Sequence, residues 1–284
     1  MRKTFALIAL FVAVTAEVSA QDDSVAFISG HWVQEAVGEG VVLKQCHFEN
    51  KDLFGANQFV SILEISPELR IDVVNAPRET LVKTTSLASE YRAVAAVNGS
   101  FFNMRTPYGG ATYTRVDGEV TDNNTLKEAK IRSYRANGSI ATLDGKAYIL
   151  KADETADWEN LIFAEDVLTA GPLMLIGGEA VEIDRTAFNI NRHPRSAVGK
   201  KADGTVVFIV VDGRRPQSAG VSIFELARIM KWAGCVDALN LDGGGSSTLV
   251  AGDKIVNRPS DNGKFDTAGE RKVANILIAR PVSE

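Results

Sequence analysis

Apolar residues in this chain fall mostly into short alternating or continuous runs bounded by turn residues, which is the pattern of β-strands. Such runs predict strands over residues 40–47, 57–65, 69–75, 93–98, 195–200, 205–211, 236–241 and 272–279. Glycine-containing dipeptides that favour tight hairpin turns occur at 117–118, 137–138, 144–145, 177–178 and 203–204. The hydrophobic pattern therefore predicts a chain built mainly of strands and hairpins.

Two segments carry the longer period of a helix, a short one over residues 85–91 and a longer one over 223–233. Ser222 is the expected N-cap of the second helix, and Glu225 completes a capping box with it. Gly234 ends this helix. Because the cap already explains Glu225, we do not expect that residue to act in catalysis.

The second helix lies between two strands, and this order predicts a βαβ unit with parallel strands. The expected fold class is α+β, with a mixed β-sheet, this parallel unit near the C-terminus and helices packed on the sheet. Each strand of the unit is followed by Asp-Gly, at Asp212 and Asp242. Parallel strands bring their carboxyl ends to one edge, where open α/β sheets bind ligands, so we expect both carboxylates there.

A hairpin around Asp203-Gly204 adds an arginine to this edge. A two-residue turn would place Arg195 opposite Asp212, whereas a three-residue turn would shift the pairing by one position. Either register puts Arg195 near the same edge as Asp212 and Asp242. The expected role of Asp212 is to orient Arg195 or to activate water.

A run of glycine and serine follows the second aspartate, and it consists of Gly243, Gly244, Gly245, Ser246 and Ser247. Such a run lets backbone N–H groups turn onto an anion, and the serines add hydroxyl donors. A tight turn is the alternative, but it would need only one glycine. We therefore favour a ligand cradle, and we count Asn240 with it as a candidate substrate contact.

Other candidate substrate-binding residues lie in loops that follow or enter strands. Asn98, at the end of a buried strand, either orients a substrate hydroxyl or caps the turn. Phe101 follows it in an aromatic loop, and Arg214 comes directly after the first Asp-Gly. Together with Arg195, Arg214 suggests recognition of a phosphate or carboxylate, because guanidinium groups bind both.

Composition narrows the classes of partner. The chain has 284 residues and a formal net charge of -5, which argues against non-specific binding of nucleic acid. Its three histidines lack zinc-ligand spacing, and neither a metal nor another cofactor is demanded, although Mg²⁺ or Ca²⁺ would suit a pair of carboxylates. Cys46 and Cys235 either form a disulfide or are buried thiols. No feature indicates a protein partner or a membrane span.

The N-terminus has the pattern of a signal peptide. A basic start, an apolar run and a small-residue site predict cleavage after Ala20 and a periplasmic or secreted protein. The expected domain organisation is a signal peptide over residues 1–20, a β-rich N-terminal segment over 21–70 and the main domain over 71–284.

Several stretches together resemble the phosphodiester glycosidase family, and they lie at residues 97–102, 171–172, 192–199, 211–214, 238–247 and 271–275. The Asn-Leu-Asp-Gly-Gly-Gly-Ser-Ser run is the most specific of them. Ser100 stands where a glycine is usual, and Lys272 where a proline is usual. The resemblance identifies residues 71–284 as the phosphodiester glycosidase domain.

The resemblance implies hydrolysis of a sugar joined through its anomeric carbon to an esterified phosphate, with a phosphorylated carbohydrate as substrate. Asp242 would then act on the sugar side, by stabilising or attacking the oxocarbenium-like centre. Two alternatives remain open: a metal-assisted phosphodiesterase in which Asp212 and Asp242 hold Mg²⁺ or Ca²⁺, and a carbohydrate- or cell-wall-binding module without turnover.

Overall fold

The structure is a computed structural model that describes residues 22–125 and 135–282. The predicted signal peptide over residues 1–20 lies outside the described residues. None of the described helices is both long enough and apolar enough to cross a membrane. The described residues include a helix over 22–28, the helices α2 (Thr84–Glu90), α4 (Ala187–Ile190) and α5 (Ile223–Trp232), and the short 3₁₀ helices η2 (Trp158–Leu161) and η3 (Gly244–Ser246).

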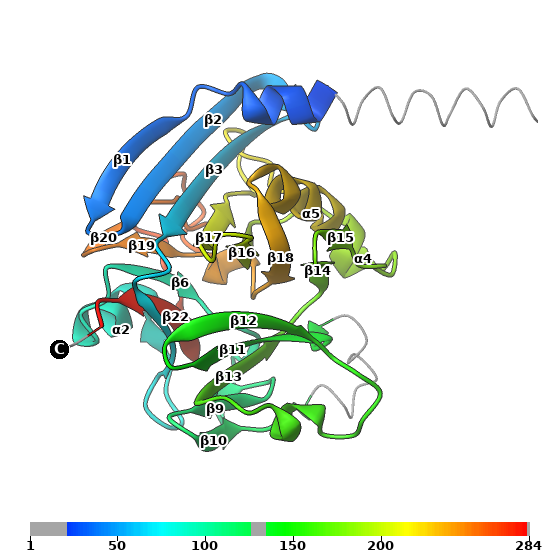
Figure 1. Cartoon of the computed structure of the whole chain (residues 1–284). Helices are drawn as coiled ribbons and strands as arrows, with labels where there is room; N and C mark the ends of the chain where they lie inside the picture. Colours follow the sequence, from blue (N-terminus) through cyan, green and yellow to red (C-terminus); the bar gives the residue numbers. More distant parts are fainter. Residues whose placement is uncertain (1–21, 126–134, 283–284) are drawn as a thin grey trace, which may run out of the picture.

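The largest sheet has eight strands and forms the upper half of the molecule in Figure 1. Its order is β1 (Val33–Gly38), β2 (Val41–Leu53), β3 (Ala56–Ile65), β17 (Val206–Val211), β16 (Arg195–Lys201), β18 (Cys235–Asn240), β14 (Leu173–Ile176) and β15 (Glu179–Ala180). The N-terminal strands thus join the C-terminal ones in a single sheet, because β3 pairs directly with β17.

Every neighbouring pair in this sheet is antiparallel, so the predicted mixed pairing is wrong and a βαβ unit of adjacent parallel strands is not confirmed. The strand β16 lies between β17 and β18 and pairs with both. The two outer strands nevertheless run in the same direction, because each is antiparallel to β16. The mainly β structure with few helices remains consistent with the α+β class.

Two five-stranded sheets complete the architecture. One has the order β20 (Lys254–Ile255), β19 (Leu249–Ala251), β6 (Ala95–Asn98), β22 (Asn275–Arg280) and β4 (Arg70–Asn75). The other, at the bottom of Figure 1, has the order β10 (Glu119–Asp122), β9 (Thr114–Val116), β13 (Asp166–Ala170), β11 (Gly138–Leu143) and β12 (Lys146–Lys151). Two small ribbons pair β21 (Lys272–Val273) with β5 (Val82–Lys83) and β7 (Phe102–Asn103) with β8 (Gly109–Gly110).

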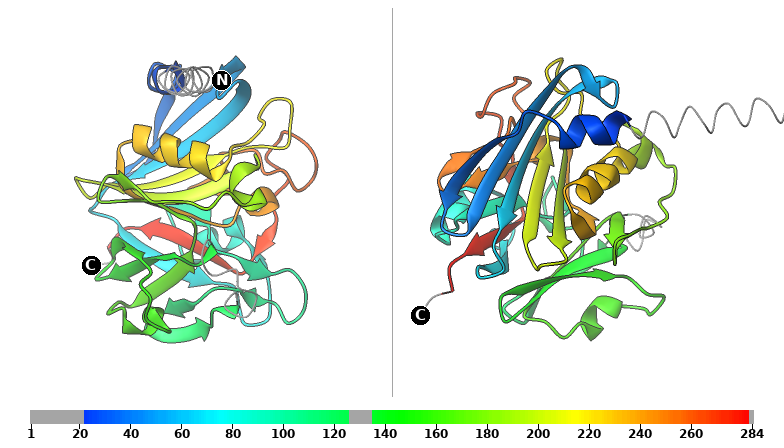
Figure 2. Two further views of the ribbon diagram at one scale, coloured as in Figure 1. Left: turned by 90° about the vertical axis from the view of Figure 1, so that its right-hand side faces the viewer. Right: turned by 45° about the horizontal axis from the view of Figure 1, so that its top comes forward.

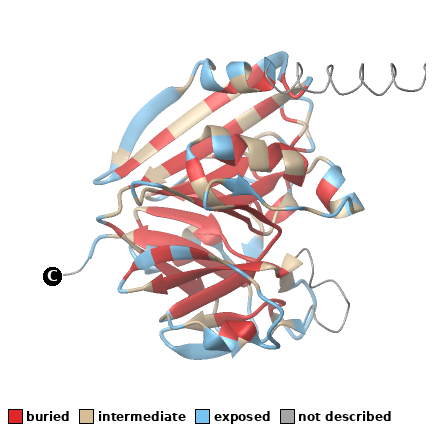
Figure 3. Cartoon of the chain, turned by 45° about the vertical axis from the view of Figure 1, so that its right-hand side comes forward, coloured by how far each residue is buried: buried red, intermediate tan, exposed pale blue. Residues whose placement is uncertain are grey.

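The main core lies between the three large sheets, which each contribute apolar side chains to it, among them Phe208, Leu277 and Leu168. Figure 3 shows these inward strands as buried, whereas the edge strand β1 is mostly exposed. Burial of apolar surface from all three sheets is the main force that holds them together.

Helices cover the outer faces of two sheets. The helix α5 lies across the outer face of the eight-stranded sheet (Figure 2), and Leu226 and Met230 are completely buried there. The predicted capping box is present, because the Ser222 hydroxyl accepts from the Glu225 backbone N–H and the Glu225 carboxylate accepts from the Ser222 N–H. The helix α2 covers the sheet that contains β6 and β22, with Leu87 buried.

The turn between β16 and β17 sets the register at the site. The Lys201 N–H donates to the carbonyl of Thr205, which leaves a three-residue loop with Gly204 at a φ of +91°. Arg195 therefore pairs with Val211 and not with Asp212. The two-residue turn is wrong because the chain here adopts the longer hairpin type with a left-handed glycine.

Two further sequence predictions have clear outcomes. Asn137-Gly138 is not a hairpin turn, since Gly138 begins β11 and pairs with Lys151 and Ala170. Cys46 and Cys235 are buried free thiols on the face of the large sheet that α5 covers.

Candidate active site

Four strand ends from two sheets meet at one edge and bring the candidate residues together. Asp212 and Asp242 follow the ends of β17 and β18, while Arg195 begins the antiparallel strand between them. Asn98 ends β6 of the neighbouring sheet, and its side-chain amide donates to the carbonyl of Asp242 over 2.7 Å. The predicted gathering of two carboxylates and a guanidinium at one edge is therefore present.

The alternation of side chains divides these residues between the two faces of the large sheet. Arg195 and Val211 are partners in register, so their side chains share the face that α5 covers. The ladder of β16 and β18 runs through Ala197 opposite Asn240, and its continuation brings Arg195 opposite Asp242. Asp212, one position beyond Val211, points to the other face.

Asp242 is the half-buried carboxylate of the site. Its backbone N–H donates to the carbonyl of Gly99 over 3.0 Å, which ties it to the loop after β6. Burial raises the pKa of Asp242 to about 6, although the Ser246 hydroxyl, the Gly243 N–H and the positive charges of Arg271 and Arg135 oppose the shift. A carboxylate with a pKa near neutrality in a cationic setting is typical of a functional group.

Arg195 does not contact Asp212, which corrects the predicted pair. It is 1% exposed, and its guanidinium donates to the carbonyls of Val221, Phe188 and Asn191 over 2.5–3.2 Å. Burial lowers the pKa of Arg195 to about 10, and the nearby Asp242 opposes this shift. Arg195 is thus a buried positive charge that acts on Asp242 through space.

Asp212 is 1% exposed and is directed away from Arg195. One carboxylate oxygen accepts from the side-chain amide of Asn257 over 2.8 Å, and the other accepts from the backbone N–H of Arg258 over 2.9 Å. Burial raises the pKa of Asp212 to about 7, against the effect of these two hydrogen bonds. The same Asn257 amide donates to the carbonyl of Ser247, so Asp212 holds the far end of the glycine-rich loop.

Asn98 is completely buried, and its hydrogen-bonding groups are occupied within the protein. The side-chain oxygen accepts from the Ser196 hydroxyl over 2.7 Å and from the Thr248 N–H over 3.1 Å. Its amide donates to Asp242 and Gly99. Of the two roles predicted for Asn98, the structure favours the one that fixes the backbone.

The glycine-rich loop uses three of its N–H groups within the protein, so these three are not available to an anion. It forms the 3₁₀ helix η3, and the N–H groups of Gly244, Ser246 and Ser247 donate to the carbonyls of Pro194, Gly243 and Gly244. The glycines instead allow close packing of cations. A Cβ at Gly244, where φ is +66°, would lie 2.9 Å from the Arg214 guanidinium, and a Cβ at Gly245 would collide with Arg271.

Asn240 also differs from its predicted role. Its amide donates to the carbonyls of Gly171 and Leu241 over 2.7 Å each, and the side chain is completely buried. It therefore joins β18 to the loop before β14 and positions the backbone that leads to Asp242.

Three residues of the site escaped the sequence analysis, namely Arg135, Phe188 and Arg271. The Arg135 guanidinium lies 4.7 Å from the ring centroid of Phe188 and 5.5 Å from that of Phe101. The Arg195 guanidinium lies 4.6 Å from the same Phe188 ring, so the two cations flank an aromatic group. Phe188 and Arg135 belong to no motif, whereas Arg271 lies within a matched family stretch.

The described residues offer no group of three His, Cys, Asp or Glu side chains that could hold a metal ion. The carboxylates of Asp212 and Asp242 have separate hydrogen-bond partners, and the alternation of side chains assigns them to opposite faces of the sheet. The metal-assisted alternative stays a prediction, which loss of activity with a chelator would support.

The site therefore combines a half-buried carboxylate with nearby guanidinium groups and an aromatic pair, an arrangement that can bind an anion. A family model described as phosphodiester glycosidase matches residues 91–280. The chain therefore belongs to the phosphodiester glycosidase family.

Its relatives include the human and bovine N-acetylglucosamine-1-phosphodiester alpha-N-acetylglucosaminidases. The human protein is 28% identical over 199 residues, which are 66% of this chain and 37% of that protein. The bovine protein is 31% identical over 181 residues, 59% of this chain and 33% of that protein. An uncharacterized prophage-derived protein of Bacillus subtilis is 28% identical over 65% of this chain and 28% of its own length. The chain thus spans about a third of these relatives.

Solved structures share the fold. The catalytic domain of the zebrafish N-acetylglucosamine-1-phosphodiester alpha-N-acetylglucosaminidase, auto-inhibited by its pro-peptide, matches with a TM-score of 0.65 and 18% identity over 89% of this chain and 85% of that one. A hypothetical protein from Synechocystis matches with a TM-score of 0.62 and 17% identity over 87% of this chain and 63% of that one.

Proposed function

We propose that this protein is a secreted hydrolase that cleaves a sugar-1-phosphodiester at the bond between the anomeric carbon and oxygen. The observation that carries the proposal is the setting of Asp242, a half-buried carboxylate with a pKa of about 6 that is influenced by Arg135, Arg195 and Arg271. Family membership supports the same reaction class. Secretion rests on the signal-peptide pattern, and a mature protein that begins at Gln21 by mass spectrometry would support it.

The guanidinium groups suit the departing group of this reaction. Breaking the anomeric bond releases a phosphate monoester, whose second pKa is about 6, so it leaves without a strong general acid. Its growing negative charge is stabilised by preorganised cations. Arg214, which is exposed over Gly244, and Arg271, which packs against Gly245, are the side chains we assign to this task.

Asp242 has the position and charge to act on the sugar. As the positive charge grows at the anomeric carbon, an ionised carboxylate on the same side of the site stabilises it or forms a bond to it. We assign Asp212 to a different task, because its carboxylate is fully hydrogen-bonded to Asn257 and Arg258 on the opposite face. It positions the loop and does not touch the reacting atoms.

Replacement of the carboxylate tests this assignment. We expect Asp242→Asn to reduce turnover of a chromogenic sugar-1-phosphodiester by about a thousandfold, within the range for loss of a catalytic side chain. The matched control is Asp253→Asn, an exposed aspartate in the turn between β19 and β20 that should keep full activity. Equal activity of the two variants, with both folded by circular dichroism, would remove Asp242 from the mechanism.

A further inference from the structure

A polar cavity lies near the candidate active site, lined by the loop that follows β4 and by segments around β8 and β10. It has a volume of about 500 Å³. Its walls come from the loop after β4, the β8 strand, the β10 strand and Ala274 just before β22. A cavity of this size accommodates a ligand of one or two small rings.

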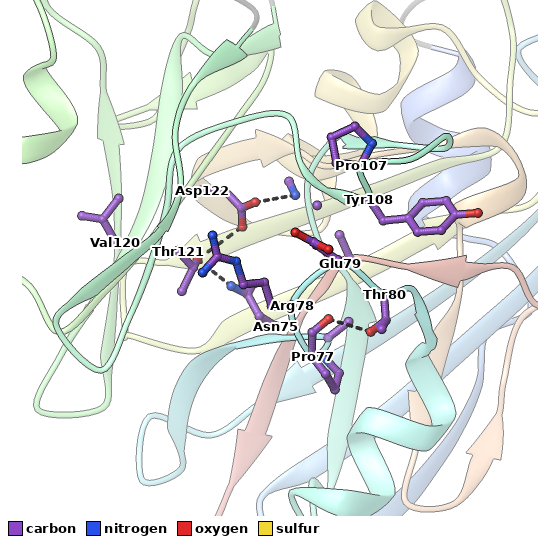
Figure 4. A pocket seen from close by; sticks show the side chains of 14 residues that line it. Asn75, Pro77, Arg78, Glu79, Thr80, Pro107, Tyr108, Val120, Thr121 and Asp122 are labelled. Carbon is purple, nitrogen blue, oxygen red and sulfur yellow. Dashed lines mark hydrogen bonds between the residues drawn. The ribbon is translucent and has the colours of Figure 1, made fainter.

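The charges around this cavity are mixed. Figure 4 shows the side chains of Arg78, Glu79 and Asp122 directed toward the same space, and all three line the cavity. Arg78 and Glu79 make no ion pair or hydrogen bond with another residue that the structure describes. Asp122 accepts from the Gly110 N–H over 2.8 Å and lies beside the Thr121 hydroxyl. The cavity therefore offers both donors and acceptors.

The guanidinium and the two carboxylates that line the cavity indicate which class of ligand it can bind. An anion would face two carboxylates, and a cation would face the guanidinium, so neither full charge is favoured. A sugar hydroxyl both donates and accepts hydrogen bonds, which suits a guanidinium beside carboxylates. Tyr108, Pro77 and Pro107 add apolar surface to the wall, where the C–H faces of a sugar ring can pack.

The cavity is close to Asp242 but separate from it. Asn75 in the cavity wall pairs with Asn275, and the next strand of the sheet ends at Asn98. Two strand spacings place Asn75 about 10 Å from Asn98, whose amide contacts the Asp242 carbonyl. A ligand bound in the cavity thus lies along the same edge as the candidate active site.

We propose that this cavity is a second binding site, which takes a neutral sugar residue and performs no chemistry. Its occupation by one part of a glycan raises the local concentration of neighbouring parts at the Asp242 site. The proposal goes beyond the reaction proposed above, because it concerns binding of uncharged sugars and holds whether or not the protein cleaves a phosphodiester.

The test is direct binding of uncharged probes to the full chain by saturation-transfer difference NMR. Methyl α-glucoside, methyl α-mannoside and methyl N-acetylglucosaminide should bind with millimolar affinity. We expect Arg78→Ala and Tyr108→Ala each to weaken binding by about fivefold or more, which corresponds to about 1 kcal/mol. Lys231→Ala, an exposed cation at the end of α5, is the control and should bind as the wild type does.

Several results would overturn the proposal. Absence of hexoside binding to the wild type is one, and binding that both cavity variants leave unchanged is another. Binding of inorganic phosphate or ethylammonium that Arg78→Ala or Glu79→Gln alters, without any hexoside binding, would assign the cavity to a charged ligand. Arg78 is exposed and without partners among the described residues, so its replacement should not disturb folding, which the melting temperature would verify.

Discussion

At the scale of single residues, the site is organised around one carboxylate and several fixed cations. The Arg195 guanidinium donates hydrogen bonds to three backbone carbonyls, so its orientation does not depend on a substrate. The Asp242 carboxylate interacts electrostatically with this buried charge and with the charges of Arg135 and Arg271. Preorganised charge of this kind needs no rearrangement when negative charge develops on a leaving group in the site.

The raised pKa of Asp242 predicts how activity depends on pH. The proposed mechanism needs the ionised carboxylate, and the pKa of the group is about 6. We therefore expect kcat/KM to be constant above this pH and to fall tenfold per pH unit well below it. The phosphodiester keeps a single charge throughout, so the substrate adds no titration in this range. A rate that rises toward acid pH would show instead that Asp242 acts as a proton donor.

Residues that lack a motif explain why part of the site could not be predicted. Phe188 comes from the short helix α4 and Arg135 from the segment before β11, and neither has a distinctive local sequence. Only the folded chain brings them beside Phe101 and Arg195. Asn98 and Asn240 were correctly placed at strand ends, but each also has partners that are distant in sequence. A sequence pattern locates such side-chain amides, but it does not show whether their hydrogen-bonding groups are occupied within the protein or free to bind a substrate.

At the scale of elements, sequence motifs predicted correctly those features that depend on interactions between neighbouring residues. The capping box of α5 and the turns at 117–118, 144–145 and 177–178 were predictable, because each depends on a few adjacent residues. The insertion of β16 between β17 and β18 was not, since strand order depends on packing across the whole sheet. Because the β16–β17 hairpin is shifted by one residue from the two-residue turn, Arg195 pairs with Val211. Asp212 therefore points to the face opposite to that of Arg195, and not to the same face.

The position of Asp212 at the end of β17 predicts a change in the pH dependence of stability. Its pKa of about 7 in the folded protein exceeds the ordinary value of 3.8, so the folded state binds more protons than the unfolded state between about pH 4 and 7. The contribution of this group is therefore stabilising at low pH and is lost as pH rises through that window. Asp242 acts in the same direction.

We expect Asp212→Asn to remove one of these contributions. The slope of unfolding free energy against pH should become shallower by up to about 1.4 kcal/mol per pH unit. Urea unfolding at several pH values between 4 and 8 measures this slope, and Asp253→Asn is the control. The variant also loses one hydrogen-bond acceptor beside Asn257 and Arg258, which should lower stability at every pH by about 1–3 kcal/mol. An unchanged slope would contradict the raised pKa.

At the scale of the whole molecule, three sheets around one core place strand ends from distant parts of the chain at a common edge. The N-terminal strands strengthen this frame, because β3 continues the sheet that carries β16 and β18. The candidate active site lies where β17, β18 and β6 end, and the cavity proposed to bind sugars follows the end of β4. A rigid frame of this kind holds loops of functional residues in place.

The most direct test of the central claim is to find which bond the protein breaks. Hydrolysis of a sugar-1-phosphodiester in water enriched in the heavy oxygen isotope distinguishes the two products by mass spectrometry. Cleavage at the anomeric carbon places the label in the hydroxyl of the released sugar, which is the result we predict. Label in the released phosphate would show attack at phosphorus and would contradict the role given to Asp242.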